Sequence, residues 1–451
     1  MRNEGLKHLW LPFTQMGDPL GATPHIVRGE GCWLIDEQGK RYLDGIASWW
    51  VNLHGHDHPR LIAALKRQAE VLPHCSLGSM THDPALRLAA GLGRIAPESL
   101  TRVFFSDDGS TAVETALKIS LQFFQQSGQE QRTRFVTLQR AYHGDTLGAV
   151  SVGGIESYHG KFRPLCFEAL FAEAPDCARC DEGDGGLHLP GGPEPSCSLK
   201  CLNSLENILQ THGADCCGLI VEPLVQGAVG MRMYRAAALA RMRELCHAHG
   251  IHLIADCVAV AFGRTGKMFA CEHAGIAPDL MAVAKGLTGG YLPLAATLAT
   301  EAIYEGFLGS YESNRQLAHG HSFTGNPLAA ACAAENLELL REEAVIDSLA
   351  PKIARLRASW WAELGDLPHV GELRQTGLIA ALDLFQDAEA RTPYPASDQI
   401  ARRVALGCIE RGLFLRPLGD ALYLLPPLAI SDDELELAVA TLREAIVEVT
   451  G

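Results

Sequence analysis

The sequence lacks an uninterrupted apolar run of the roughly 18–20 residues that a membrane-spanning helix needs. It also lacks an excess of positive charge, because 38 lysine and arginine residues stand against 53 aspartate and glutamate residues, a net charge of −15. A surface of that sign opposes general binding to nucleic acid or anionic lipid. Hydrophobic residues make up 47% of the chain, which excludes disordered and collagen-like classes of protein.

Cysteine is not scarce, since the chain has 14. Disulfide frameworks nevertheless belong to short secreted chains. No apolar segment of signal-peptide length lies near the start, Met1-Arg2-Asn3-Glu4. We therefore expect a soluble, cytoplasmic protein with reduced thiols. The length of 451 residues predicts two or three domains of about 150 residues each.

The middle of the chain alternates short apolar runs with longer amphipathic segments. Strands that alternate with helices favour an α/β fold with a mostly parallel sheet covered on both faces. Helical spacing of apolar residues is found over 112–124 and 236–249. The apolar runs that predict strands are 102–105, 135–138, 219–221, 252–255 and 280–283.

The two ends of the chain predict a smaller α+β domain. Residues 21–46 indicate a β-meander, and beyond about residue 345 helices alternate with short apolar runs before a final helix that begins near Asp432. We expect the N-terminal part of this domain at 1–60, the large α/β domain at 61–345 and the C-terminal part at 346–451.

Asp107-Asp108-Gly109-Ser110 lies between a predicted strand and a predicted helix. A glycine turn that opens a helix directs free backbone N–H groups and the positive end of the helix dipole at one point, which suits a phosphate. The Ser110 hydroxyl adds a donor. The alternative is an ordinary helix N-cap in which Ser110 satisfies its own first turn.

Asp256 and Lys285 each follow an apolar run, at the carboxyl edge of the predicted sheet, where ligands bind in open α/β proteins. A carboxylate there can hold a cationic ligand nitrogen or simply cap a loop. A lysine at the end of a buried strand has a lowered pKa and a nucleophilic amine, unless its side chain extends to solvent. A phosphate site, a carboxylate and such a lysine are together what pyridoxal 5′-phosphate requires. Tyr142 offers an aromatic face for its ring.

These motifs resemble the class III aminotransferases of fold type I. The resemblance runs from Leu9-Trp10 to the last helix and is carried by the segments Ala255-Asp256 to His273 and Lys285-Gly286-Leu287-Thr288-Gly289-Gly290, with Tyr142-His143-Gly144-Asp145 and Glu222-Pro223. Trp49-Trp50 and Arg416-Pro417 resemble one subfamily, which aminates a keto acid with an aliphatic chain. A class III ω-aminotransferase for lysine, a diamine or γ-aminobutyrate is the alternative. A binding protein that keeps the fold is another, but it has no need for both Lys285 and Asp256.

The resemblance implies a role for each site residue in a homodimeric, pyridoxal-phosphate-dependent enzyme. Lys285 bonds to the cofactor and moves a proton, and Asp256 keeps the ring nitrogen protonated. Tyr142 stacks near the ring and lines the substrate pocket. Gly109 and Ser110 bind the phosphate, together with His321 and Ser322 from the partner subunit. Substrate contacts are implied for Phe13, Trp49, Trp50, Tyr142, Lys285, Gly320 and Arg416, the last as the partner of a carboxylate.

Three departures bear on selectivity. Phe13 stands where the subfamily often has a tyrosine that contacts substrate, and the missing hydroxyl removes one hydrogen bond, worth about 1 kcal/mol. Cys257 and Ala261 replace residues common beside the cofactor aspartate, which places altered packing there. His321-Ser322 replaces Pro-Thr but keeps a hydroxyl.

Several residues outside this set have an open role. Cys177, Cys180, Cys197 and Cys201 form a C-x2-C…C-x3-C pattern that either holds a structural zinc ion or consists of free thiols on a loop. We assign no metal to the site itself. Alternate residues of the histidine run His54-Gly55-His56-Asp57-His58 seldom converge on a metal. Arg264 is a supporting residue or a surface ion-pair partner, and Glu222 orients the cofactor or bridges to Arg264. Trp49-Trp50 could be ordinary core, although neighbours on a strand face opposite sides.

Overall fold

The computed structural model describes residues 2–17, 24–180 and 197–451. A seven-stranded sheet in the order β4-β12-β11-β10-β7-β5-β6 lies at its centre. Strand β12 is antiparallel to both of its neighbours, and the other pairs are parallel. The strands are β4 (Arg102–Ser106), β5 (Arg134–Leu138), β6 (Leu170–Ala172), β7 (Cys216–Val221), β10 (His252–Asp256), β11 (Leu280–Val283) and β12 (Ala295–Ala299).

The expected mostly parallel sheet is confirmed, and all five expected strands belong to it. Two strands were not expected. Strand β12 has the sequence Ala-Ala-Thr-Leu-Ala, whose alanines have low strand propensity, but every one of its residues is buried. Strand β6 has three residues, too few for a clear pattern. Burial between neighbours therefore decides both strands.

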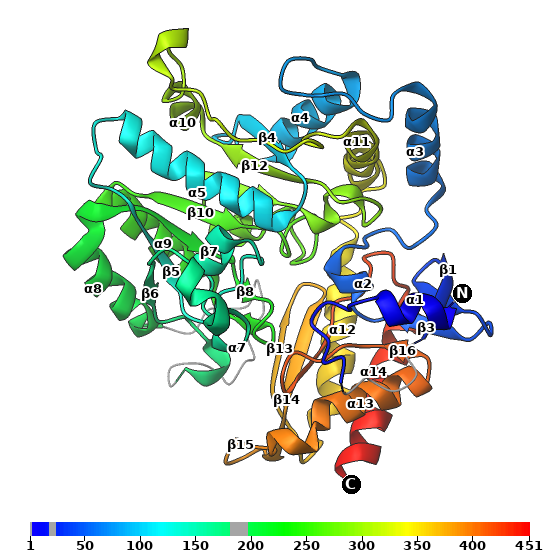
Figure 1. Cartoon of the computed structure of the whole chain (residues 1–451). Helices are drawn as coiled ribbons and strands as arrows, with labels where there is room; N and C mark the ends of the chain where they lie inside the picture. Colours follow the sequence, from blue (N-terminus) through cyan, green and yellow to red (C-terminus); the bar gives the residue numbers. More distant parts are fainter. Residues whose placement is uncertain (1, 18–23, 181–196) are drawn as a thin grey trace.

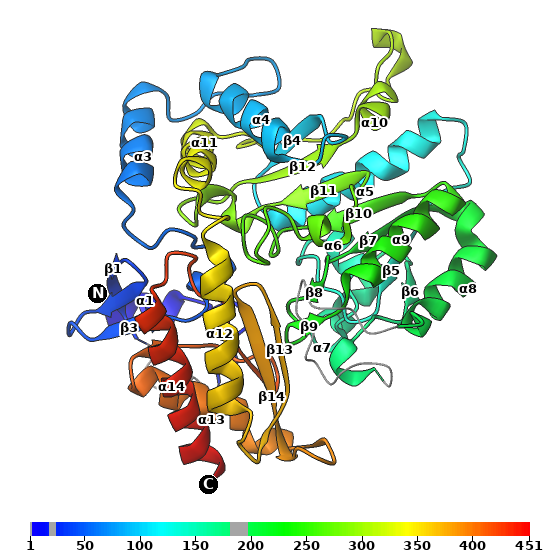
Figure 2. The ribbon, with the colours of Figure 1, turned by 180° about the vertical axis from the view of Figure 1, so that it is seen from behind.

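Helices cover both faces of this sheet (Figures 1 and 2). Helix α5 (Gly109–Gln126) packs on one face, where Leu280 and Ala282 point. Helix α9 (Ala236–His249) packs on the other, in the core cluster that holds Met281 and Val283. The alternation of successive side chains between two cores explains why these strands read as continuous apolar runs. The remaining helices around this sheet are α3 (Pro59–Val71), α4 (Asp83–Ile95), α6 (Leu147–Ser151), α7 (Glu156–His159), α8 (Asn203–His212), α10 (Glu301–Glu305) and α11 (Pro327–Glu342).

A four-stranded sheet joins the two ends of the chain. Its order is β1-β2-β3-β16, and β16 pairs in parallel with β3. The expected meander supplies β1 to β3; residues 21–23 of that prediction lie outside the described residues. The strands are β1 (Ile26–Glu30), β2 (Trp33–Asp36), β3 (Arg41–Asp44) and β16 (Leu413–Phe414).

The C-terminal residues form a further sheet and three helices, which Figure 2 shows side by side. Strands β13 and β14 pair in antiparallel fashion, and β17 and β15 flank β14. No helix among residues 2–17, 24–180 and 197–451 has both the length and the apolar character to cross a membrane. The elements are β13 (Val370–Thr376), β14 (Ile379–Asp387), β15 (Thr392–Pro393), β17 (Ala421–Leu424), α12 (Leu349–Leu364), α13 (Ile400–Glu410) and α14 (Asp432–Thr450), with α1 (Arg2–His8) at the other end of the chain.

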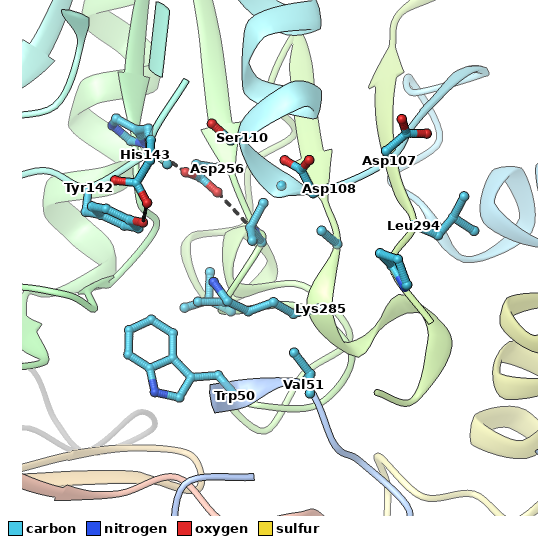
Figure 3. Close-up of a pocket in the computed structure, with 18 of the residues that line it drawn as sticks. Trp50, Val51, Asp107, Asp108, Ser110, Tyr142, His143, Asp256, Lys285 and Leu294 are labelled. Carbon is cyan, nitrogen blue, oxygen red and sulfur yellow. Dashed lines mark hydrogen bonds and ion pairs between the residues drawn. The ribbon is translucent and has the colours of Figure 1, made fainter. Parts of the chain in front are cut away.

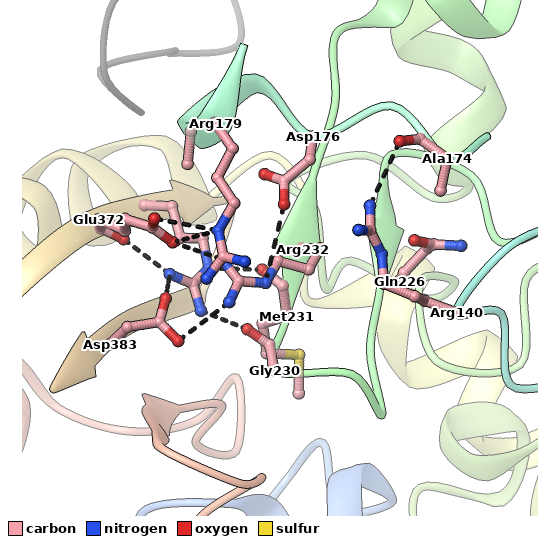
Figure 4. A network of polar contacts seen from close by, with 12 residues as sticks. Arg140, Ala174, Asp176, Arg179, Gln226, Gly230, Met231, Arg232, Glu372 and Asp383 are labelled. Carbon is pink, nitrogen blue, oxygen red and sulfur yellow. Dashed lines mark hydrogen bonds and ion pairs between the residues drawn. The ribbon is translucent and has the colours of Figure 1, made fainter. Parts of the chain in front are cut away.

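A buried charge network connects this C-terminal sheet to the segment that follows β7 (Figure 4). Arg232, on the hairpin of β8 (Val225–Gln226) and β9 (Arg232–Met233), bonds to Glu372 at 2.5 Å and to Asp383 at 3.1 Å. Arg374 donates to the other oxygen of Asp383 at 2.5 Å. Because each charge meets an opposite one, the network can remain buried.

Candidate active site

A cavity of about 740 Å³ lies at the carboxyl ends of β7, β10 and β11, the expected edge of the sheet (Figure 3). That volume is in the range of small-molecule and cofactor sites. Six of the predicted site residues line it, and they come from five separate segments of the chain. They are Trp50, Gly109 with Ser110, Tyr142, Asp256 and Lys285; Glu222, His143, Asp145 and Thr146 also line it.

The start of helix α5 forms one wall of the cavity. Asp108 is the N-cap, with its side chain accepting from the Thr111 N–H at 3.0 Å, so the alternative in which Ser110 caps its own helix is wrong. The backbone N–H groups of Gly109 and Ser110 meet no acceptor within the described ranges. A Cβ on Gly109 would lie 2.7 Å from Val258, so only glycine fits this close approach. The wall is thus a cradle of free donors at a helix N-terminus, which fits an anion.

The Ser110 hydroxyl lies beside this cradle. It accepts a hydrogen bond from the Thr146 N–H at 3.0 Å and lies 2.7 Å from the Thr146 hydroxyl. The two hydroxyls fix each other's position at the edge of the cavity, so their donors are held in place before a ligand arrives.

Asp256 is held by two contacts at the end of β10. One carboxylate oxygen lies 2.7 Å from Nδ1 of the buried His143, and the other accepts from the Val258 N–H at 3.1 Å. The second ring nitrogen of His143 is buried without a partner in the described part of the chain. A carboxylate fixed in this way can hold a proton on a ligand nitrogen.

Lys285 extends into the same cavity from the end of β11 (Figure 3). Its amine lies 4.9 Å from the centre of the Trp50 ring, and it has no hydrogen-bond or ion-pair partner among the residues described. Burial lowers the pKa of Lys285, opposed by the charges of Asp256 and Glu222. The backbone of Lys285 has a φ of 45°, a conformation that non-glycine residues rarely adopt. An unpaired amine with a lowered pKa is a nucleophile.

Tyr142 is fixed by three neighbours. Its hydroxyl donates to Asp145 at 2.7 Å, and its backbone N–H donates to Glu222 at 3.0 Å. The buried ring of His159 stacks on it, with centroids 5.9 Å apart and planes 11° from parallel. Tyr142 itself lines the cavity.

Arg264 and Glu222 do not bridge to each other. Arg264 is buried, and it donates to the backbone oxygens of Asn52, at 2.5 Å, and Pro426. The interpretation as a surface ion-pair partner is wrong, because burial is complete enough to lower its pKa to about 9. Glu222 instead accepts from the N–H groups of Tyr142 and Gly227, the latter at 2.9 Å, and burial raises its pKa to about 7.

Trp49 and Trp50 lie in a tight turn and not in a strand. Residues Ala47–Trp50, helix α2, all have positive φ, 74° at both tryptophans. The turn directs the two rings differently, since Trp50 is 4% exposed and Trp49 is 39% exposed. Trp50 lines the cavity, and its indole N–H donates to the Tyr423 hydroxyl at 3.0 Å. Trp49 does not line the cavity.

Phe13, Trp49 and Arg416 form a cluster beside the cavity. The Arg416 guanidinium lies 4.7 Å from the centre of the Trp49 ring and donates to the Phe13 carbonyl at 2.7 Å. The rings of Phe13 and Trp49 are 6.0 Å apart. The structure therefore brings together three predicted substrate residues from three separate segments, and Phe13 and Arg416 are 403 residues apart in the sequence.

Gly320, His321 and Ser322 do not join the cavity of their own chain. They lie on the exposed segment that precedes α11, where the His321 N–H donates to the Thr324 hydroxyl at 2.8 Å. This position agrees with, but does not test, the prediction that they serve a partner subunit.

Cys257 and Ala261 are both buried next to Asp256. The neighbouring thiol of Cys271, together with burial, raises the pKa of Cys257. Cys257 is therefore a neutral, packed thiol.

The described residues contain no group of three or more histidine, cysteine or carboxylate side chains that could hold a metal ion. His54 bonds to Asn336 and His56 to Asp44, so these rings already have structural partners. Cys177, Cys180, Cys197 and Cys201 are all of intermediate exposure. Burial raises the pKa of Cys177 to about 12 when no metal ion is bound. Residues 181–196, between the two cysteine pairs, lie outside the described residues.

The sequence analysis gave no role to several site residues, among them Thr146, Asp145 and Tyr158. Asp145 holds the Tyr142 hydroxyl, although it had been quoted only as part of a motif. Tyr158, on α7, contacts the Phe13 ring at 5.5 Å and the edge of Tyr142 at 6.4 Å. Its spacing from Tyr142 gives no signal, because the intervening loop sets the contact.

Comparison with known proteins gives relatives over nearly the whole chain. Adenosylmethionine-8-amino-7-oxononanoate aminotransferases from Nitratidesulfovibrio vulgaris and Geobacter sulfurreducens are 47% and 46% identical over 100% of this chain, which covers 82% and 98% of those proteins. The crystal structure of the enzyme of that name from Methanocaldococcus jannaschii has a TM-score of 0.91 at 38% identity, with 98% of this chain and 97% of that one covered.

Other transaminases share the fold. The ω-transaminase of Pseudomonas jessenii in complex with PMP has a TM-score of 0.92 at 30% identity, over 99% of this chain and 98% of that one. The family described as aminotransferase class-III matches residues 20–446. This match spans the cavity and all its lining residues, so the fold-type I architecture expected from the motifs is confirmed. The chain belongs to the class III aminotransferases.

Proposed function

We propose that this protein is a pyridoxal-phosphate-dependent aminotransferase of biotin synthesis. It moves an amino group from S-adenosylmethionine to 8-amino-7-oxononanoate, which gives 7,8-diaminononanoate. The observation that carries this proposal is the unpaired Lys285 amine, which faces the same cavity as Asp256 and the free N–H groups at the start of α5. The names of the relatives at 46–47% identity supply the substrates.

The residues present fit pyridoxal phosphate. Gly109 and Ser110 offer N–H donors for the phosphate, Asp256 a carboxylate for the ring nitrogen, and Tyr142 an aromatic face. When bound, pyridoxal phosphate supplies an aldehyde that takes up the amino group and a ring that withdraws electrons. His321 and Ser322 of the partner subunit complete the phosphate site.

Lys285 and Asp256 carry the proton chemistry, and His143 and Asp145 position groups beside them. The lowered pKa of Lys285 leaves a fraction of its Nζ unprotonated, so Nζ can take the proton from the α-carbon of the donor and return it. Asp256 holds a proton on the ring nitrogen, and His143 Nδ1 fixes that carboxylate at 2.7 Å. Asp145 orients the Tyr142 hydroxyl through a 2.7 Å bond.

The aromatic residues bind the substrate. Trp50 at the cavity and Trp49 beside it bury the aliphatic chain of the keto acid, with Phe13 against Trp49. Arg416 has no carboxylate partner in the described part of the chain, so its guanidinium is available for the carboxylate of the keto acid. Gly320 lies beside the substrate in the partner's site.

Each half-reaction tests this proposal separately. The purified holoenzyme is mixed with S-adenosylmethionine, lysine or γ-aminobutyrate, and the conversion of bound cofactor from the aldehyde to the amine form is followed by absorbance. We expect conversion by S-adenosylmethionine and reversal by 8-amino-7-oxononanoate. If only lysine converted the cofactor, lysine and not S-adenosylmethionine would be the amino donor. That result would support the ω-aminotransferase alternative, which the absent hydroxyl at Phe13 favours. No reversal by the amino keto acid would refute the proposed acceptor.

We also propose a homodimer. A cavity of about 690 Å³ with a mostly apolar lining lies on edge strand β4, next to α10 and the segment after it. The exposed Leu308, Tyr311 and Phe323 lie on that segment, and Tyr311 is 92% exposed. If a second copy covers this face, residues 320–322 of the first copy would lie at the cavity of the second. Light scattering tests this, with a dimer expected for the wild type and dissociation expected for Tyr311→Asp with Leu308→Asp.

A further inference from the structure

Tyr158 connects the catalytic cavity to the Phe13–Trp49–Arg416 cluster. The centroids of the Tyr158 and Phe13 rings are 5.5 Å apart, and their planes are tilted by 59°. The centroids of the Tyr158 and Tyr142 rings are 6.4 Å apart, and the planes are nearly perpendicular, at 89°. Tyr142 lines the cavity, whereas Phe13 does not. Through these contacts Tyr158 connects Tyr142, in the cavity, to Phe13, which bonds to Arg416.

The hydroxyl of Tyr158 has no hydrogen-bond partner among the described residues. The other tyrosines here are satisfied: Tyr142 donates to Asp145, and Tyr423 accepts from Trp50. The Tyr158 oxygen is also absent from the buried polar atoms of the described chain, so it faces accessible space. A ligand that enters this space can accept a hydrogen bond from the Tyr158 hydroxyl.

The Arg416 guanidinium and the Tyr158 ring both contact Phe13. The charge of Arg416 acts on Tyr158, where it opposes the rise in pKa that burial causes. Its one hydrogen bond within the described residues goes to the Phe13 carbonyl, which leaves further N–H groups free. A carboxylate has four acceptor positions and can bond to a guanidinium and a hydroxyl together.

We propose that Tyr158 determines the specificity for a substrate carboxylate. Its hydroxyl donates a hydrogen bond to the carboxylate that Arg416 binds, and so replaces the hydroxyl that Phe13 lacks. This inference rests on the proposed function. It assigns Phe13 the role of an apolar support, which packs on Tyr158 and Trp49 and holds Arg416 through its carbonyl.

Tyr158→Phe tests the proposal because it removes only the oxygen and keeps the ring contacts. The holoenzyme variant is assayed with 8-amino-7-oxononanoate and with the corresponding primary carboxamide. We expect KM for the carboxylate compound to rise about tenfold, as for the loss of a hydrogen bond to a charged group. We expect kcat to stay within about twofold, and KM for the carboxamide to change by less than about threefold.

Tyr394→Phe is the matched control, since Tyr394 lies in the C-terminal sheet region beside His369, away from the cavity. It should change neither KM. An unchanged KM for the carboxylate compound in Tyr158→Phe would overturn the proposal, and so would an equal rise for both compounds, which would indicate a packing effect. If wild-type protein does not turn over the amino keto acid at all, the proposed function fails instead.

Discussion

Two clusters of charged and polar groups both include residues from the end of β7 and the segment after it, and they differ in how fully their groups are paired (Figures 3 and 4). In the network of Arg232, Arg374, Glu372 and Asp383, every charged side chain has an opposite partner. In the cavity, the Lys285 amine, one ring nitrogen of His143 and two N–H groups of α5 have no partner within the described residues.

This difference indicates that the fully paired cluster has a structural role and that the incompletely paired cluster is a binding site. Unpaired buried polar groups cost free energy, so a protein keeps them where a ligand satisfies them. Removing a group from the cavity should therefore affect function, and removing one from the network should affect stability.

The largest expected effect is that of Lys285→Ala. It should lower kcat about 10³-fold or more, because no other group can supply the nucleophile and move the proton. The urea midpoint should be unchanged, since the amine has no hydrogen-bond or ion-pair partner among the described residues to lose. Steady-state kinetics and urea unfolding measure the two.

Lys352→Ala is its matched control. Burial lowers the pKa of Lys352 as well, but its amine donates to the Leu428 carbonyl at 2.6 Å. This variant should keep its turnover and lose about 1–2 kcal/mol of stability. Turnover by Lys285→Ala at the wild-type rate would remove Lys285 from the mechanism.

Arg374→Met should give the largest loss of stability. Arg374 is 1% exposed, and its removal leaves Asp383 with less compensation in the interior. Breaking a buried pair typically costs about 3–5 kcal/mol. Urea unfolding measures this, with Arg341→Met as control, because the exposed Arg341–Glu338 pair is worth about 0–1 kcal/mol. Equal losses in the two variants would contradict the comparison.

The pH dependence of the unfolding free energy should reveal the raised pKa of Glu222. Burial raises its pKa from 4.5 to about 7, so the folded protein must ionise a buried group that ionises more easily when unfolded. Below about pH 4.5 both states are protonated and the stability is fully present; it is then lost as pH rises through about 7.

Glu222→Gln removes this loss. The unfolding free energy of the wild type should fall by about 3 kcal/mol relative to the variant between pH 4.5 and 8. Denaturant unfolding over that range measures it, and Glu389→Gln, at an exposed position, should run parallel to the wild type. A constant difference between wild type and Glu222→Gln would show that Glu222 is ionised at low pH.

The central sheet and the cofactor-binding part of the site could be predicted from the sequence, because both follow from local patterns. Apolar runs mark β4, β5, β7, β10 and β11, and a polar residue after such a run lies at the ligand-binding edge. Gly109, Tyr142, Asp256 and Lys285 were placed together on that basis. Alanine-rich β12 could not be predicted, because packing alone makes it a strand.

What sequence could not supply are contacts set by long loops. The Arg416–Phe13 bond, the Tyr158–Phe13 contact and the opposite directions of Trp49 and Trp50 depend on turns with positive φ, for which none of these residues has a preference. The domain limits 1–60, 61–345 and 346–451, the cytoplasmic location and the absence of nucleic-acid binding stay predictions.

The smallest expected effect concerns Ser110, where the two kinds of cluster meet. Its hydroxyl is paired with Thr146, yet it lies at the edge of the donor cradle. Ser110→Ala should weaken the binding of pyridoxal phosphate about five- to tenfold, the loss of roughly one hydrogen bond, as measured by absorbance titration of the cofactor-free protein.

Ser120→Ala, on the same helix, is the control. That hydroxyl is buried between the Cys217 carbonyl, at 3.1 Å, and His252, at 2.9 Å, away from the cavity. It should lower the urea midpoint and leave the affinity for pyridoxal phosphate unchanged. If Ser110→Ala instead lost only stability, its hydroxyl would belong with the paired network, and the cradle would consist of backbone N–H groups alone. Pairing within the protein would then be enough to tell a structural hydroxyl from a ligand-binding one, even at the edge of the cavity.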